Sequence, residues 1–85
     1  MKMYRVFMTR RARKELQSLP AKDRERVVAA MGSLGTDPFQ GKKLQGEWEG
    51  KWSLRVWPYR IIYTVEKEIV TVTVLRVGHR RDAYR

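Results

Sequence analysis

Residues 50–85, GKWSLRVWPYRIIYTVEKEIVTVTVLRVGHRRDAYR, decide the fold of this chain. Apolar and polar residues alternate along this stretch, as they do in antiparallel strands that have one buried and one solvent-facing side. Pro58 and the pair 67–68 divide it into three predicted strands, over residues 51–57, 59–66 and 69–77. Because short turns join these strands, they must run antiparallel to one another.

The upstream half begins with a further strand and a first helix. Residues 4–8 are predicted as the strand, and Thr9 is a suitable helix N-cap because its hydroxyl can accept a hydrogen bond from an early helical N–H. Three apolar residues spaced i, i+4 and i+7 predict a helix over residues 10–19, and Pro20 ends it for want of an N–H donor. These three are Ala12, Leu16 and Leu19.

A second helix is expected over residues 21–34, which makes a helical hairpin with the first. Its predicted core face holds Val27 or Val28, Met31 and Leu34. Its predicted outer face holds Lys22, Asp23 and Arg26. Turn residues follow at 35–38, and residues 39–50, which contain three glycines, are interpreted as a loop. The predicted fold is therefore α+β, with the order β-α-α-β-β-β: a small antiparallel sheet with the N-terminal helical hairpin packed on one face.

Size and composition limit the function. A chain of 85 residues forms one domain, 1–85. Nineteen Lys and Arg against nine Asp and Glu give a net charge of +10, which is typical of a domain with a polyanionic partner. No apolar run is long enough to span a membrane, and the first residues do not resemble a signal peptide, so a cytoplasmic protein is expected. With no cysteine and one histidine, no metal or other cofactor is expected.

Alternation along the strands places a basic surface opposite the helices. Trp52, Leu54 and Val56 share the predicted core side. The other side collects Lys51, Ser53, Arg55, Trp57 and Arg60, and the basic tail ends nearby. Such a cluster is suited to phosphate, although basic residues on an open sheet face are also commonly just solvated. Trp57 can stack on a base, or it can pack beside Pro58.

RNA cleavage by attack of a 2′-hydroxyl on its own phosphate needs a proton acceptor, a proton donor and positive charge. Arg60 and Arg80 can supply the charge, but guanidinium groups are poor bases. His79 is the natural acid–base candidate, or alternatively an exposed tail residue beside two arginines. Tyr84 can take part if nearby cations lower its pKa, or alternatively it packs over the sheet edge. The sequence has no glycine-rich phosphate loop, paired carboxylates or nucleophile triad.

Six short pieces of the chain together resemble the RelE/ParE superfamily of toxins from type II toxin–antitoxin pairs, and they are most similar to its RelE-type mRNA interferases. The pieces are ARKEL (12–16), LP (19–20), KLQG (43–46), LRV (54–56), YRIIY (59–63) and VGHRRDAY (77–84). The resemblance implies a RelE-like fold and a ribosome-dependent endoribonuclease that cuts mRNA at the A site, beside 16S rRNA, without a metal. The catalytic residues that it implies are Lys51, Arg60, Arg80 and Tyr84. His79 occupies a position that differs within the family, and its chemistry makes it a further expected catalytic residue. RNA-binding roles are expected for Arg55, Trp57, Arg81 and Arg85.

Two departures from the family pattern leave other functions open. Ser53 stands where a second basic residue is common, and Trp57-Pro58 replaces the usual small turn before Tyr59. The alternatives are a ParE-like inhibitor that binds DNA gyrase without chemistry, and an inactive relative that only binds its antitoxin. Under each of them the resemblance implies a cognate antitoxin, acidic or amphipathic, that wraps the toxin and also acts as a DNA-binding autorepressor.

Overall fold

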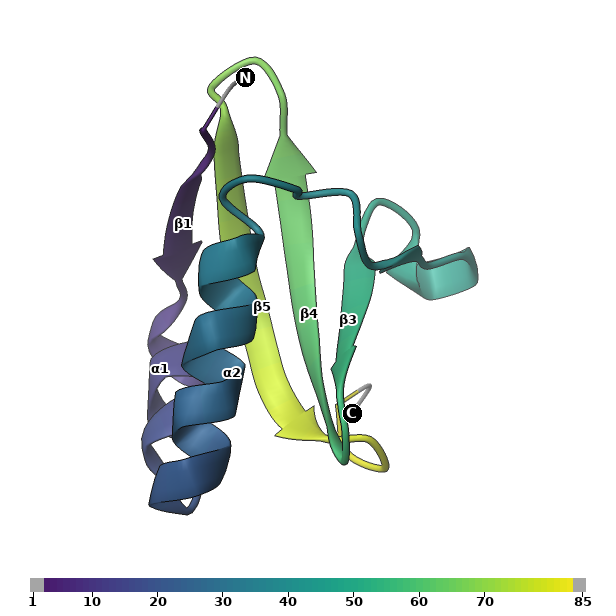
Figure 1. The fold of residues 1–85 in the computed structure, drawn as a ribbon. Helices are drawn as coiled ribbons and strands as arrows, with labels where there is room; N and C mark the ends of the chain where they lie inside the picture. The colour runs from purple at the N-terminus through teal and green to yellow at the C-terminus, as the bar shows by residue number, and fades with distance from the viewer. Residues whose placement is uncertain (1–2, 84–85) are drawn as a thin grey trace.

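The computed structural model describes residues 3–83 and has two helices and a five-stranded mixed sheet, so the predicted α+β class is confirmed (Figure 1). The elements follow in the order β1 (Arg5–Met8), α1 (Arg10–Gln17), α2 (Ala21–Ser33), β2 (Lys42–Lys43), the 3-10 helix η1 (Gly46–Trp48), β3 (Trp52–Val56), β4 (Tyr59–Glu66) and β5 (Thr71–His79). The strands lie side by side as β1-β5-β4-β3-β2.

The sheet differs from the expected one at both edges: one edge strand is parallel, and the other is a strand that was not predicted. β1 pairs with β5 in parallel, from Arg5 opposite Thr71 to Met8 opposite Val74. Both helices separate β1 from the later strands in the chain, so no hairpin turn forces β1 to be antiparallel. At the other edge, β2 lies within the stretch predicted as a loop, and it pairs Lys42 with Ser53 and Lys43 with Trp52.

The centre of the sheet is a β3–β4–β5 meander, as predicted, with one irregularity. Ile62 lies opposite Arg76 and Tyr63 lies opposite Val74, so Leu75 is an extra residue in β5, a β-bulge. The bulge changes which side chains face the helices: Val72, Val74 and Val77 belong to the core, whereas Arg76 turns to the other side. The turn before β5 is also longer than expected, because it takes residues 67–70, and Val70 has a φ of 49°.

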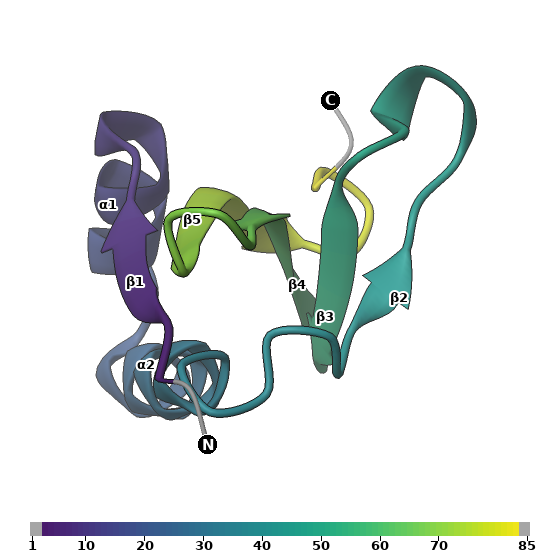
Figure 2. The same cartoon turned by 90° about the horizontal axis from the view of Figure 1, so that it is seen from above.

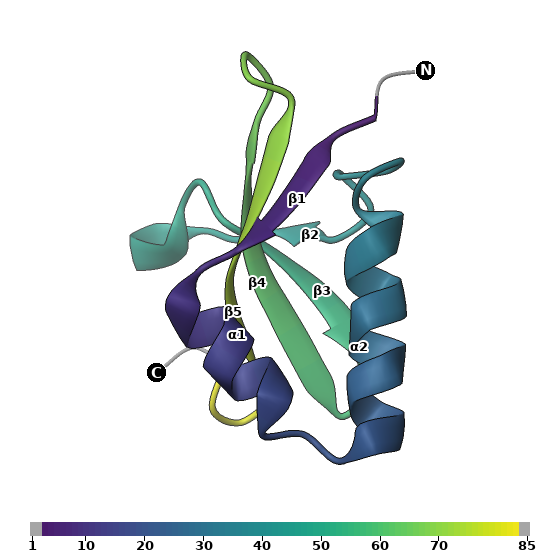
Figure 3. The same cartoon turned by 90° about the vertical axis from the view of Figure 1, so that its left-hand side faces the viewer.

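The helix α1 lies along the free edge of β5, beyond the end of β1 (Figures 2 and 3). Thr9 is its N-cap, as predicted: its hydroxyl accepts a hydrogen bond from the Ala12 N–H at 3.1 Å. The same hydroxyl donates to the carbonyl of the bulged Leu75 at 3.0 Å. In the following turns, the Glu15 carboxylate accepts a hydrogen bond from the Val77 N–H at 3.0 Å. The helix thus provides hydrogen-bond partners where β5 has no neighbouring strand.

The helix α2 covers one face of the sheet, and Figure 2 shows the C-terminal tail on the opposite side. Val27 and Met31 of α2 and Leu34 after it are buried against the sheet, together with Ala12 and Leu16 of α1. Of the two alternatives considered, Val27 is the core residue, and Val28 is 49% exposed. Among residues 3–83, no helix is both long enough and apolar enough to cross a membrane. The face of the sheet away from α2, called here the open face, is where the basic residues gather.

Candidate functional site

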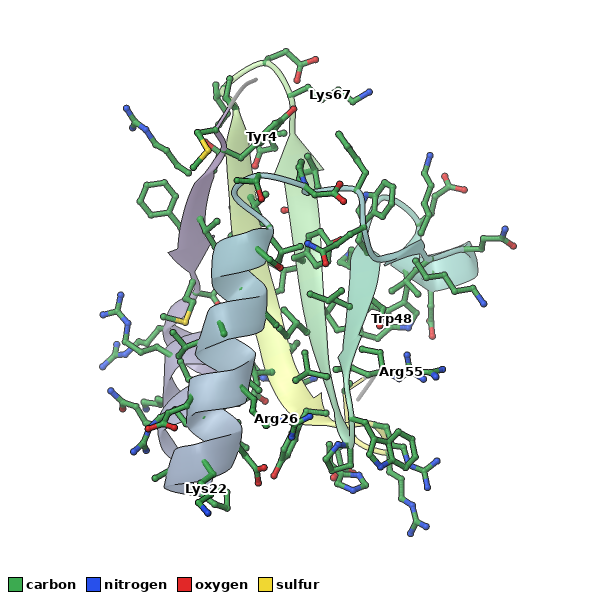
Figure 4. The ribbon with its side chains drawn as sticks, viewed as in Figure 1. Tyr4, Lys22, Arg26, Trp48, Arg55 and Lys67 are labelled. Atoms are coloured by element: carbon green, nitrogen blue, oxygen red, sulfur yellow. The ribbon has the colours of Figure 1, made fainter. Side chains whose placement is uncertain are left out.

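Two arginines lie directly opposite each other on the open face. Arg55 of β3 pairs with Arg60 of β4, and Arg60 in turn pairs with Gly78 of β5. Directly opposed residues in an antiparallel pair project to the same side, so both guanidinium groups belong to one surface. Figure 4 shows Arg55 extending away from α2. Gly78 has no side chain, and the chain at Ala83 packs against β5 at this position.

The environment of Arg60 is unusual for an arginine that is half-buried. Within the described part of the chain, its side chain has no hydrogen bond or ion pair. Removing a cation partly from water without a partner is unfavourable, and a second cation on Arg55 adds repulsion. A bound anion would relieve both costs. Guanidinium groups bind phosphate through paired hydrogen bonds, so phosphate is the ligand that this arrangement favours.

The chain after β5 folds back across the open face. The Asp82 and Ala83 N–H groups donate to the His79 carbonyl at 2.7 and 3.0 Å, which forms a tight turn. Ala83 is fully buried, and a Cβ added at Gly78 would lie 3.6 Å from the Ala83 Cα. The tail therefore passes in van der Waals contact over β5 at Gly78, the residue that pairs with Arg60.

Arg80 is held at the β3–β4 turn. Its N–H donates to the Pro58 carbonyl at 2.8 Å, and its guanidinium carbon lies 4.6 Å from the centroid of the Trp57 ring. This is a cation–π contact between two residues that the sequence placed in the site. The Trp57 ring is 56% exposed. Arg80 thus covers one face of the ring.

Two residues of α2 anchor the same turn. Arg26 donates through Nη2 to the Trp57 carbonyl at 2.7 Å, and Tyr59 donates through its hydroxyl to Asp23 Oδ2 at 2.8 Å. That hydrogen bond, then desolvation and the negative charge of Asp23, raise the pKa of Tyr59 above its usual value. Tyr59 therefore stays protonated at neutral pH. The sequence placed Asp23 and Arg26 on the outer face of α2, and their contacts show that they also support the turn below Arg80; no pattern in the sequence signalled this.

His79 does not lie on the open face with Arg60. It pairs with Tyr59, and the two rings meet edge to face with centroids 6.3 Å apart. The bulge at Leu75 is the reason: without it, alternation from Val72 and Val74 would turn His79 to the open side. The His79 Nδ1 accepts a hydrogen bond from the Arg81 N–H at 3.3 Å, which ties the ring to the tail. The structure therefore does not bring the His79 side chain onto the open face with Arg55 and Arg60.

The remaining predicted residues are distributed around this centre. Lys51 precedes β3, with its ammonium group 5.9 Å from the Trp48 ring centroid, and it lies four residues along the strand from Arg55, roughly 13 Å. Arg81 is exposed in the tail. Tyr84 and Arg85 lie outside the described residues. The structure therefore gathers Arg55, Arg60, Arg80 and Trp57, and it leaves Lys51 at the far end of β3.

A basic residue that the sequence analysis missed lies beside Ser53. Lys42 of β2 pairs with Ser53 and, with Arg55 and Arg60, lines a hollow of about 330 Å³. The lysine was not predicted here because it belongs to a two-residue strand inside a stretch interpreted as a loop. The spacing of cations along the chain carries no signal for such a pairing. Ser53 itself is buried.

Metal ligands are not grouped in this region. Among residues 3–83, no three His, Cys, Asp or Glu side chains lie close enough together to hold a metal ion. The cations and the aromatic ring described above are of the kinds suited to charge stabilisation and to phosphate binding.

Comparison with known proteins identifies the class to which this fold and basic surface belong. Residues 6–84 match the family described as the ParE toxin of the type II toxin–antitoxin system parDE. The chain is 42% identical to Toxin RelG of Mycobacterium tuberculosis, over 96% of this chain and 97% of the relative. It is 32% identical to Toxin RelE of the same organism, over 96% of this chain and 87% of the relative.

Solved structures agree with these relatives. The toxin–antitoxin complex RelBE2 from Mycobacterium tuberculosis contains a chain with a TM-score of 0.87 and 40% identity, over 96% of this chain and 97% of that one. The archaeal RelE–RelB complex from Pyrococcus horikoshii gives a TM-score of 0.79 at 29% identity, over 95% and 99%. The chain therefore belongs to the RelE/ParE superfamily of type II toxin–antitoxin toxins, as its sequence motifs indicated.

Proposed function

We propose that this toxin is an endoribonuclease that cuts mRNA in the A site of the ribosome, in the cytoplasm and without a metal. The observation that carries the proposal is the half-buried Arg60, which has no protein partner among residues 3–83 and stands opposite Arg55. The names of the relatives RelG and RelE, and the neighbouring structures that contain RelE, support the RelE-type function.

The proposed reaction begins with attack of an mRNA 2′-hydroxyl on the adjacent phosphorus. A P–O bond forms to the 2′-oxygen, and the bond to the 5′-oxygen breaks, which leaves a 2′,3′-cyclic phosphate. Negative charge increases on the phosphate oxygens in the transition state. Arg60 would bind this charge from β4, and Arg80 from the tail, because both remain cationic at any physiological pH. Arg55, Trp57, Arg81 and Arg85 would hold the neighbouring RNA.

The proton transfers need other groups. Tyr84 is the proposed acid–base residue that follows from the family resemblance, and in the sequence it comes directly after Ala83. Lys51 would reach the RNA from the start of β3. The His79 ring contacts Tyr59 and lies on the other face of the sheet from Arg60. Its proposed role is therefore to position the tail, through the hydrogen bond that it accepts from the Arg81 N–H.

A cognate antitoxin is the proposed protein partner. The neighbouring structures of RelBE2 and of RelE–RelB are complexes of toxin with antitoxin. With a net charge of +10, this chain is expected to bind an acidic segment of such a partner. Neutralisation would follow from occupation of the open face or from distortion of the tail that carries Arg80.

One observation favours a second function. The family that matches residues 6–84 is named for ParE toxins, and a ParE-like inhibitor of DNA gyrase would need no cleavage chemistry. Ser53, where a basic residue is common, also fits a relative that has lost activity and only binds its antitoxin. These alternatives predict that substitutions at Arg60 and Arg80 change binding but have no effect on RNA integrity.

Toeprinting on purified ribosomes with a programmed mRNA tests the proposal. Wild type is compared with the Arg80→Ala, Tyr84→Ala double variant, and both proteins must first give the same thermal unfolding curve. A-site cleavage by wild type alone is the expected result. If neither protein cuts, a gyrase supercoiling assay with the same two proteins decides between inhibition and loss of activity.

A further inference from the structure

The line of basic residues on the open side of β3 is interrupted at Ser53. Lys51 precedes it and Arg55 follows it by two residues, which is the spacing of side chains on one face of a strand. The gap is filled from the neighbouring strand. Lys42 of β2 lies directly opposite Ser53, so its side chain projects to the same face.

The backbone that carries Lys42 is held in place although β2 has two residues. The N–H of Gly41 donates to the hydroxyl of Tyr63 at 3.1 Å, and Tyr63 is fully buried in the core. A Cβ at Gly41 would lie 2.5 Å from that hydroxyl oxygen and 2.7 Å from the Ser53 carbonyl oxygen, so only glycine permits this approach. The core thereby fixes the position of Lys42 beside β3.

The side chains around the hollow are arranged for an anion. Lys42, Arg55 and Arg60 contribute three positive charges, and no acidic residue is among the described residues that line it. The small, buried Ser53 leaves room between the lysine and the arginines. Within residues 3–83, Lys42 has no side-chain hydrogen bond or ion pair, as is also true of Arg60. Three cations without protein partners around a hollow of about 330 Å³ repel one another until an anion binds.

We infer that Lys42 supplies from β2 the positive charge that is missing at Ser53, and that with Arg55 and Arg60 it forms a phosphate-binding subsite for the RNA backbone. The inference rests on the proposed function for the identity of the ligand as RNA. The binding of a phosphate group by the three cations does not depend on it. Lys42 holds this phosphate from the β2 side, opposite the two arginines, and so positions the RNA strand; it transfers no proton.

The neighbouring Lys43 provides a matched control. It has the same charge and lies on the same strand, but it pairs with Trp52 and lines a different hollow with Phe39 and Lys67. Substitution of either lysine by alanine lowers the net charge equally, so a difference between the two variants reports position and not total charge. The rescue variant Lys42→Ala, Ser53→Lys returns the charge to the hollow from β3.

The test measures kcat/KM for A-site cleavage by the full chain, wild type and these three variants, on programmed ribosomes. Loss of one charged hydrogen bond to phosphate is expected to lower kcat/KM about tenfold or more in Lys42→Ala. Lys43→Ala is expected to change it less than twofold, and the rescue variant is expected to regain most of the loss. Equal kcat/KM values for Lys42→Ala and Lys43→Ala, at equal thermal stability, would overturn the inference.

An NMR titration with inorganic phosphate separates the subsite from the cleavage function. In wild type, the backbone amide signals of Gly41, Lys42 and Ser53 are expected to shift on addition of phosphate, and the shifts are expected to disappear in Lys42→Ala but not in Lys43→Ala. If wild type cuts no RNA and these shifts are seen, the proposed function fails while the phosphate subsite stands. Absence of the shifts in wild type contradicts the subsite, whatever the protein cleaves.

Discussion

Arg60 and Arg76 lie on the same face of the sheet, but they differ in whether the protein provides partners for the guanidinium group. Arg76 is 9% exposed and fully engaged: its guanidinium group contacts the Glu15 carboxylate at 3.0 Å and donates to the Asp82 carbonyl at 3.3 Å. Arg60, two strand positions away across β4, has no side-chain partner among residues 3–83. The first arginine stabilises the fold, and the second remains available to a ligand.

This contrast shows why a count of basic residues does not locate a site. Glu15 of α1 neutralises the edge of the open face along β5, whereas at the β3–β4 end no carboxylate is among the described residues that line the hollow. Of the acids near that end, Asp23 is engaged by Tyr59 and Arg26 on the side of α2. For locating a ligand site, the informative basic residues are those whose charge is not paired with a described residue of the protein.

The largest expected effect on stability is that of Arg76→Ala. Removing Arg76 from this largely buried ion pair leaves the Glu15 carboxylate with the exposed Arg11 in place of its close partner, which is expected to cost about 3–5 kcal/mol in free energy of unfolding. Arg55→Ala, on the same face but exposed, is the control and is expected to change stability by less than about 0.5 kcal/mol. Urea unfolding monitored by tryptophan fluorescence measures both. Similar losses for the two variants would remove the distinction between the two ends of the face.

A smaller effect is expected for Glu15→Gln. The amide oxygen of the glutamine can still accept the hydrogen bond from the Val77 N–H, but the negative charge that balances Arg76 is lost. This loss is expected to lower the free energy of unfolding by about 1–3 kcal/mol. Arg11→Gln is the matched control, because Arg11 contacts the same carboxylate at 3.7 Å from an exposed position and is expected to contribute at most about 1 kcal/mol. The same unfolding experiment applies. A larger loss for Arg11→Gln would show that the buried pair is not the one that stabilises α1 on β5.

The smallest expected effect concerns Tyr63, which links the core to the site through Gly41. Burial is the main cause that raises the pKa of Tyr63. A raised pKa in the folded state means that the stabilisation is complete below the unfolded value of about 10 and is lost as pH rises through the folded pKa. Tyr63→Phe removes the hydrogen bond from Gly41 and is expected to cost about 1 kcal/mol at neutral pH.

Unfolding measured from pH 8 to pH 12 checks this prediction. Wild type is expected to lose stability more steeply above pH 10 than Tyr63→Phe does, because the phenylalanine has no proton to lose. Tyr4→Phe, at a position without that hydrogen bond, serves as the control. Parallel pH profiles for wild type and Tyr63→Phe would contradict the assignment.

Local features were readable in the sequence, and features that depend on distant pairing were not. The Thr9 cap, the Pro20 boundary and the buried face of Val27, Met31 and Leu34 follow from short-range rules, and the structure contains all of them. The predicted bounds of β4 agree with the structure, since Pro58 marks its start.

The parallel pairing of β1, the short β2 and the bulge at Leu75 depend on contacts between residues far apart in the chain. If side chains alternated without interruption through Leu75, His79 would project to the same face as Arg60. The single extra residue turns the His79 side chain to the opposite face. For the same reason the position of Lys42 beside Ser53 could not be seen in the sequence. The shared face of Arg55 and Arg60 was predictable from alternation, and the pairing that brings Lys42 beside them was not.

Single-turnover cleavage of ribosome-bound mRNA by Arg60→Ala, measured together with its thermal unfolding, tests the central claim most directly. The predicted result is a loss of about 10²–10³-fold in cleavage rate with an unchanged unfolding midpoint, since Arg60 stabilises the transition-state phosphate and no part of the fold. Arg60→Lys is expected to recover part of the rate, because it keeps the charge but not the paired hydrogen bonds. A wild-type rate in folded Arg60→Ala would contradict the account, and so would a large fall in the unfolding midpoint, which would make Arg60 a structural residue like Arg76.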